Sequence, residues 1–178
     1  MTVRDFDVTS DVNPLDTERL LRTLGDHGVE YVLIGGLAAI AHGSMLATAD
    51  ADLLPRLDDE NLDRLLDALA ALDARVLVAE DRLAMEAGEP WEVPELRRGP
   101  AGLRSAEAWH FSTDAGPVDV VLHAAGVGPY DLHRHRAEER EVFGLVVAVA
   151  SREDLIASKR SLGRPKDRHV LEELDPDG

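Results

Sequence analysis

The sequence predicts a mixed α/β (α+β) fold, in which helices cover one mixed sheet. Short runs of Val, Ile and Leu recur along the 178 residues, and segments with helical apolar periodicity lie between them. No change of composition marks a linker. We therefore expect a single domain over residues 1–178, with a flexible start at 1–12 and a tail at 175–178.

Helices and strands alternate in the first half of the chain. Asn13 can cap a first helix that Gly25 or Gly28 ends, and Asp58 can cap a later helix whose leucines form one apolar stripe. The predicted order is a helix from Asn13, a strand over 30–35, a short helix over 36–43, a strand over 49–55, a helix after Asp58 and a strand over 75–79.

The second half begins with residues 81–106, whose three prolines predict a long excursion away from the core. The sequence Asp-Ala-Gly at 114–116 then predicts a hairpin between two apolar strands. The elements expected here are strands over 108–113 and 117–124, a solvated helix over 130–142, a strand over 144–150, a helix over 152–162 capped by Ser151 and ended by Gly163, and a short helix from Pro165 to about Leu174.

The composition excludes several classes of protein. A net charge of −16 disfavours broad binding of DNA or RNA and favours a metal cation or a basic partner. The chain has no cysteine, which excludes disulfides and cysteine metal sites. Its apolar runs are too short to span a bilayer, and its first residues do not resemble a signal peptide. We expect a cytoplasmic protein that does not bind membranes.

Three aspartates are candidates for a catalytic metal site. Asp50 and Asp52 are two residues apart on a predicted strand, where their side chains share one face and repel each other unless a cation lies between them. Asp119 lies inside another apolar strand, where an unpaired charge is costly. Together they predict a site for Mg²⁺, with room for two metal ions. Solvated turn residues and an edge-strand charge are the alternative interpretation.

A glycine pair joins the first predicted strand to a short helix. Gly35 and Gly36 allow the backbone to approach a ligand closely, and backbone N–H groups there can bind phosphate. Ser44, after that helix, can donate to a phosphate or can simply end the helix. His42 and His123 are interpreted as packing residues.

These residues together resemble the catalytic pattern of the nucleotidyltransferase superfamily, which has the DNA polymerase β-like fold. A closer resemblance is to small bacterial and archaeal nucleotidyltransferase-like proteins. These carry a pattern hGG-L-A---HG---T-D-D that matches residues 34–52, and a pattern DLI-SK---GR-KD that matches DLIASKRSLGRPKD at 154–167. The likeness covers roughly residues 15–175, and related proteins include AbiEii-type toxins of toxin–antitoxin pairs and antibiotic nucleotidyltransferases.

The resemblance implies a nucleotidyltransferase fold and assigns roles to the residues above. The glycine pair would bind the triphosphate of an NTP, such as ATP, the paired aspartates would bind Mg²⁺, and Asp119 would complete the catalytic site. One position departs from the pattern, because relatives often have an arginine where this chain has Leu46, before Thr48. The lost cation predicts altered phosphate or acceptor contacts, or weakened activity.

Only two of the 19 basic residues are lysines, and both lie in the second matching segment. Lys159 falls within the apolar stripe of its predicted helix, between Leu155 and Ile156, so it must snorkel or find an anion. The resemblance implies that Lys159 and Lys166 contact nucleotide phosphates. A snorkelling stem is the alternative for Lys159, and Asp167 can equally be an ordinary acid of a first helical turn.

The sequence thus predicts a Mg²⁺-dependent nucleotidyltransferase that moves a nucleoside monophosphate from an NTP to an acceptor hydroxyl. The toxin-like resemblance favours a macromolecular acceptor, tRNA or protein, and a cognate antitoxin as partner. The first alternative is a small-molecule (antibiotic) nucleotidyltransferase, which the acidic surface favours through a cationic substrate. The second is a catalytically weak relative that binds a nucleotide or a protein partner.

Overall fold

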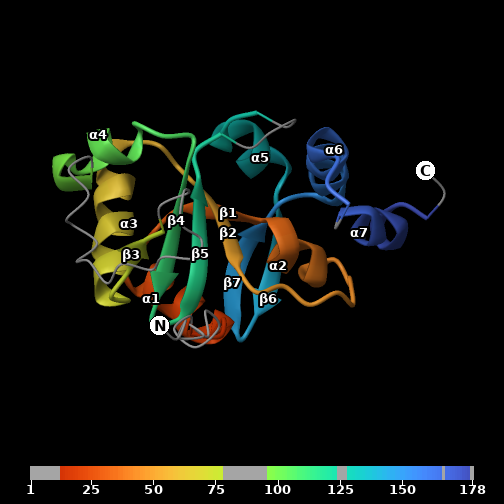
Figure 1. Cartoon of the computed structure of the whole chain (residues 1–178), viewed down its shortest axis with the longest axis horizontal. Helices are drawn as coiled ribbons and strands as arrows, with labels where there is room; N and C mark the ends of the chain where they lie inside the picture. The colour runs from red at the N-terminus through yellow and green to blue at the C-terminus, as the bar shows by residue number, and fades with distance from the viewer. Residues whose placement is uncertain (1–12, 78–95, 124–127, 166, 177–178) are drawn as a thin grey trace, which may run out of the picture.

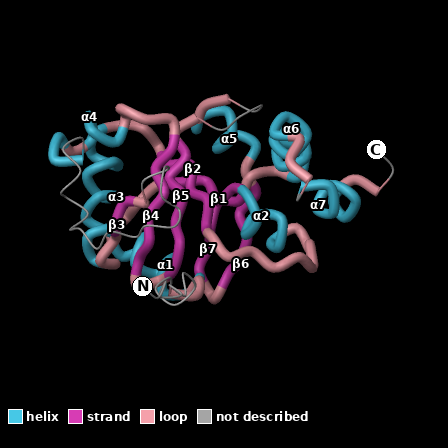
Figure 2. Tube along the Cα trace, viewed as in Figure 1, coloured by secondary structure: helices cyan, strands magenta, loops and turns pink. Residues whose placement is uncertain are grey.

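A computed structural model describes residues 13–77, 96–123, 128–165 and 167–176, and a seven-stranded sheet runs through it in the order β3-β4-β5-β2-β1-β7-β6 (Figures 1 and 2). The elements are α1 (Thr17–Asp26), β1 (Tyr31–Ile34), α2 (Gly35–Ala41), β2 (Ala51–Pro55), α3 (Asp59–Ala71), β3 (Arg75–Val76), the 3₁₀ helix η3 (Leu96–Arg98), α4 (Pro100–Leu103), β4 (Ala108–Thr113), β5 (Gly116–Val121), α5 (Tyr130–Arg136), β6 (Glu138–Val142), β7 (Leu145–Val149), α6 (Arg152–Leu162) and α7 (Asp167–Leu174).

The sheet is mixed, as the sequence predicts. β1 runs antiparallel to β2 and parallel to β7, while β2 runs parallel to β5. Two hairpins, β4–β5 and β6–β7, extend it on either side with antiparallel pairs. Because parallel neighbours need crossover connections, strands distant in the sequence become adjacent at the centre of the sheet.

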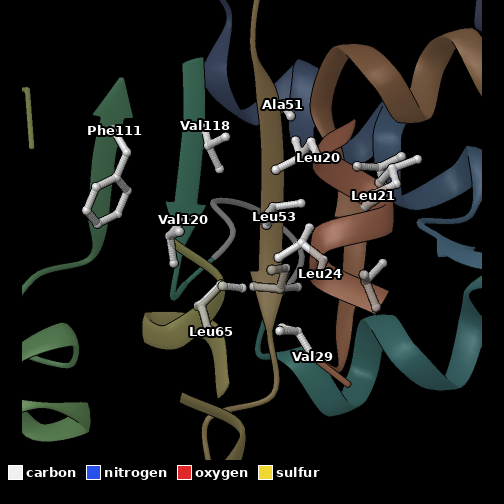
Figure 3. Packing of buried hydrophobic residues seen from close by; sticks show 14 of the residues in the cluster. Leu20, Leu21, Leu24, Val29, Ala51, Leu53, Leu65, Phe111, Val118 and Val120 are labelled. Atoms are coloured by element: carbon white, nitrogen blue, oxygen red, sulfur yellow. The ribbon is translucent and has the colours of Figure 1, made fainter. Parts of the chain in front are cut away.

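The main hydrophobic core lies between one face of the sheet and helices α1 and α3 (Figure 3). Alternate residues of the central strands point into it, and leucines of the two helices pack against them. Side chains that fill this core include Leu20, Leu21, Leu24, Leu65, Ala51, Leu53, Phe111, Val118 and Val120. The intervening residues of the same strands therefore lie on the opposite face of the sheet, where a functional site can form.

The predicted helix caps are confirmed in two of three cases. The side chains of Asp58 and Ser151 accept hydrogen bonds from Asn61 N–H and Asp154 N–H, and Gly163 ends α6 in the left-handed conformation. The prediction for the first helix was wrong, because α1 is capped by Asp16 instead of Asn13. Asp16 lies three residues before the Arg19 N–H that it accepts, which is the spacing that capping requires.

Two further predictions need correction. Residues 130–142 do not form one helix, because α5 ends at Arg136 and the following charged segment pairs with β7 as strand β6. Such a polar segment fits a strand at the edge of a sheet, where one side faces water. The last helix begins at Asp167, two residues after Pro165. The predicted flexible start, Lys166 and most of the excursion at 81–106 lie outside the described residues.

The helices of the described residues are short. None of them combines the length and apolar character that crossing a membrane requires.

One histidine of α5 is buried without a hydrogen-bond partner. His133 is only 2% exposed, and within the described part of the chain neither ring nitrogen is hydrogen-bonded. Desolvation lowers its pKa, an effect that the charge of Asp154 opposes and that of Arg136 reinforces. The folded state therefore favours the neutral imidazole.

This predicts a specific loss of stability in mild acid. The pKa of His133 is lower in the folded than in the unfolded chain, so its contribution is complete above about pH 6.5 and declines as the pH falls through the folded-state value. Urea unfolding between pH 7.5 and pH 5 should show the free energy of unfolding decreasing more steeply in the native chain than in His133→Leu. His135→Leu, on the exposed side of the same helix, should follow the native curve. Parallel curves for all three proteins would contradict the assignment.

Candidate active site

A row of four residues crosses the centre of the sheet on the face opposite the main core. Ile34 of β1 pairs with Asp52 of β2, Asp52 with Asp119 of β5, and Asp119 with His110 of β4. Register partners share one face of a sheet, with their Cβ atoms about 4.5–5.5 Å apart in antiparallel pairs. The structure therefore places Asp52 beside Asp119, the juxtaposition that the sequence predicts.

Asp50 lies near Asp52, as predicted, but it is not part of the strand that the sequence predicts for it. It lies in a bend immediately before β2, so strand alternation does not place it beside Asp52. Thr48 instead fixes the bend, because its hydroxyl donates to Asp50 Oδ1 at 2.8 Å. Threonine here thus has a defined contact in addition to any preference for extended backbone.

Glycine is required at positions 35 and 36 because the side chains of Asp52 and Thr48 lie directly against the backbone there. Gly35 has a φ of +65°, and a Cβ added to it would lie 1.8 Å from Asp52 Oδ2. A Cβ on Gly36 would lie 2.4 Å from the Thr48 hydroxyl oxygen. Both distances are far inside van der Waals contact, so only glycine lets the β1–α2 turn lie against the acidic residues.

The three carboxylates repel one another. Burial, followed by the negative charges of Asp50 and Asp119, raises the pKa of Asp52 from 3.8 to about 7. The backbone N–H of Gly36 and the ammonium group of Lys159 act in the opposite direction. The site therefore carries an excess of negative charge that a bound cation would relieve.

Lys159 is buried, as its place in the apolar stripe of α6 predicts, and it forms an ion pair with Asp167. Its Nζ lies 3.2 Å from Asp167 Oδ1, with side-chain exposures of 9% and 3%. Asp167 opens α7, which packs beside α6 at one end of the molecule (Figure 1). The α6–α7 contact thus holds a lysine within electrostatic reach of Asp52.

Arg164 is a second cation near the carboxylates, and the sequence reasoning missed it. Its Nε donates to Asp167 Oδ2 at 2.8 Å, and its side chain is 47% exposed. The hydrogen bond with Asp167 raises the pKa of the Arg164 guanidinium, and the charges of Asp52 and Asp50 add to this effect. Its position in the GRPKD segment, beside the two noted lysines, is the signal that could have identified it.

The remaining candidates have other environments. The Ser44 hydroxyl donates to Glu173 on α7, and His42 Nε2 donates to the Ala150 carbonyl at 2.8 Å. The first contact binds the loop after α2 to α7, and the second confirms His42 as a packing residue. His123 is exposed beyond the end of β5, so the interpretation of it as a packing residue was wrong. Lys166 is outside the described residues.

The acidic residues fit a divalent cation in their chemistry. Carboxylate oxygens are the ligands that Mg²⁺ prefers, and the negative charges of Asp50 and Asp119 add to burial in raising the pKa of Asp52. Among the described residues, however, no group of three or more His, Asp or Glu side chains is already arranged to hold a metal ion. One oxygen of Asp50 faces Thr48 and one of Asp119 faces His110. Sharing one cation among all three carboxylates would therefore require at least one of these side chains to move, while the second oxygens of Asp50 and Asp119 are not engaged in these contacts.

Comparison with known proteins supports the fold. No protein-family model matches the chain, and no curated protein matches it. Among solved structures, it is similar to the crystal structure of "a putative nucleotidyltransferase (TM1012)" from Thermotoga maritima, with a TM-score of 0.51 and 16% identity over 92% of this chain and 96% of the other. At this identity the likeness concerns the fold alone. The comparison therefore confirms the predicted fold, a mixed sheet covered by helices, which this chain shares with that structure.

Burial of Asp52 and its repulsion by Asp50 and Asp119 predict that its ionisation destabilises the folded protein. The pKa of Asp52 is raised on folding, so stability is complete below the unfolded value near 3.8 and declines as the pH rises through about 7. Asp52→Asn cannot ionise and should be more stable than the native chain at pH 8, by on the order of 2 kcal/mol after allowance for solvent screening. Metal-free urea unfolding should show this gain vanishing near pH 4. The exposed Asp67→Asn serves as control, and a gain independent of pH would contradict the prediction.

The glycine turn predicts a sharp contrast between two Gly→Ala variants. Gly35→Ala combines a left-handed backbone with displacement of the Asp52 carboxylate, so the free energy of unfolding should fall by more than the roughly 1–2 kcal/mol of the backbone term alone. Gly25→Ala lies in α1 with nothing within 4 Å of the added Cβ, and it should be neutral or stabilising by up to about 1 kcal/mol. Equal effects in a urea titration would contradict this reading of the turn.

Proposed function

We propose that this protein is a Mg²⁺-dependent nucleotidyltransferase that moves a nucleoside monophosphate from an NTP to an acceptor hydroxyl. One observation carries the proposal. Carboxylates on adjacent strands lie beside a glycine turn, and two cations of the α6–α7 segment interact electrostatically with Asp52. This arrangement combines groups that attract metal ions with groups that attract phosphate.

The nucleotide is proposed to bind on the side of the site that faces the glycine turn. Gly35 and Gly36 let the turn lie directly against Asp52 and Thr48, so a triphosphate held by a cation on the carboxylates would also lie close to the backbone of the turn. Lys159 and Arg164 supply the positive charge that a triphosphate needs, and Lys166 is the further candidate from the sequence. Arg164 is also proposed to supply a cation in a chain that has Leu46 where relatives often have an arginine. Asp167 holds both Lys159 and Arg164 in place through its two carboxylate oxygens.

The carboxylates are proposed to act on the reacting atoms. Asp50 and Asp52, with Asp119, would hold Mg²⁺, which supplies Lewis-acid stabilisation of the charge on the transferring phosphoryl group. The acceptor oxygen bonds to the α-phosphorus, the bond from that phosphorus to the bridging oxygen breaks, and pyrophosphate leaves. Asp119 accepts the proton of the acceptor hydroxyl. The protein contributes by positioning and electrostatics, without a covalent intermediate.

The acceptor is proposed to be a macromolecule, tRNA or protein, in line with the toxin-like resemblance of residues 154–167. A cognate antitoxin would then be the partner, and the cytoplasm the compartment that supplies NTP. The net charge of −16 favours a second candidate, transfer to a small cationic molecule such as an antibiotic. A third candidate, weak binding without transfer, is favoured by Leu46, which is 36% exposed where a cation is expected.

A transfer assay tests the proposal and names the acceptor class. Purified protein is incubated with Mg²⁺, each α-labelled NTP in turn, and bulk tRNA or a cell extract. Label should appear on RNA or protein, and Asp52→Asn should reduce it at least 100-fold, because the excess charge that attracts the metal is lost. Chelation of the metal should have the same effect.

The exposed variant Asp67→Asn is the matched control and should transfer label at the native rate. Label on a small molecule, with drug resistance on overexpression, would replace the toxin-like acceptor with the antibiotic class. NTP binding by calorimetry without any transfer would support the third candidate. Neither binding nor transfer in the folded native protein would refute the proposed function.

A further inference from the structure

A histidine on β4 contacts the third carboxylate of the site. His110 and Asp119 are register partners on antiparallel strands, and His110 Nδ1 lies 2.7 Å from Asp119 Oδ1. An ionised carboxylate can only accept a hydrogen bond, so only the Nδ1–H could donate between these two groups. The contact occupies one oxygen of Asp119 and leaves the other for a further partner.

The backbone of His110 is held from both sides. On one side β4 pairs with β5 along its whole length, and on the other the N–H of Leu77 donates to the His110 carbonyl at 2.7 Å. The imidazole therefore projects from the interior of the sheet and not from a loop. A side chain mounted in this way can fix the orientation of its partner more narrowly than a residue on a surface loop can.

The His110–Asp119 contact is poorly explained as a device for stability. The two side chains are 37% and 21% exposed, so water could solvate either group in the absence of the other. The neighbouring Phe111 points to the opposite face and fills the main core, so the packing of β4 does not depend on the imidazole. What the contact does determine is the direction in which the carboxylate of Asp119 points.

We propose that His110 is a positioning residue for Asp119, and that its Nδ1–H orients the carboxylate so that the second oxygen is available to a divalent cation shared with Asp52. The inference rests on the proposed function, because it assigns His110 to the same site. It extends the site to β4, a strand that carries none of the residues matched to the nucleotidyltransferase pattern. The site then spans four adjacent strands, from the glycine turn after β1 to His110.

Metal affinity tests this role without requiring an acceptor. The probe is Mn²⁺ alone, with the unbound ion measured by electron paramagnetic resonance at fixed protein concentration. Specific binding is defined as the part that Asp52→Asn and Asp119→Asn abolish, which separates it from loose association with the acidic surface. His110→Ala should weaken this specific binding about 10-fold, the effect typical of residues that orient metal ligands.

Two further variants make the result specific to the Nδ1–H donor. In His110→Asn the side-chain amide can place an N–H near the position of Nδ1, so the affinity should return to within about 3-fold of native. His135→Ala, an exposed histidine on α5, should leave the affinity unchanged. Far-ultraviolet circular dichroism and thermal unfolding show that each variant is folded.

The outcomes separate this inference from the proposed function. If the native protein has no Mn²⁺ binding that depends on Asp52, the proposed metal site falls and this inference falls with it. If that binding exists and His110→Ala matches the native affinity, only the role of His110 is overturned. Equal weakening in His110→Ala and His110→Asn also overturns it, because orientation through Nδ1–H would then not be the cause.

Discussion

Parallel pairing of β2 with β5 is the constraint on which the rest of the molecule depends. It sets Asp52 against Asp119 across the middle of the sheet while Ala51, Val118 and their neighbours fill the core on the other face. One register thus determines both the hydrophobic packing and the placement of the charges. A slip by one residue would bury carboxylates in the core and expose the apolar side chains, so the register that packs the core also places the aspartates.

The remainder of the chain compensates for the charge that this register concentrates. The C-terminal helices bring Lys159 and Arg164 near the carboxylates, and Asp167 connects the two cations from a nearly fully buried position. Burial alone would raise the pKa of Asp167, but the hydrogen bonds from Arg164 and Lys159 keep it below its ordinary value. The basic counterpart of the acidic site therefore comes from a C-terminal segment that follows all three aspartates in the sequence.

Local patterns in the sequence are sufficient for much of this architecture. Capping residues locate α3 and α6, and apolar runs locate β1, β2 and β7, because these signals act within a few residues. The place of His110 depends on a finer detail. A three-residue loop at 114–116 would pair Phe111 with Asp119, whereas the observed pairing of Thr113 with Gly116 moves His110 into that position. Arg164 acts on Asp52 and Asp50, which are distant in the sequence, and a single sequence does not display such contacts. Strand β6 pairs with the adjacent β7, but its charged residues give no apolar signal for a strand.

Because a chain is synthesised from its N-terminus, the acidic residues of the site are made before the basic ones. The aspartates leave the ribosome well before α6 and α7, and β1 gains its parallel neighbour β7 only when nearly the whole chain is available. Pairings between such distant segments form late in folding. A nascent chain therefore holds its acidic residues without the cations that balance them until α6 and α7 have been synthesised.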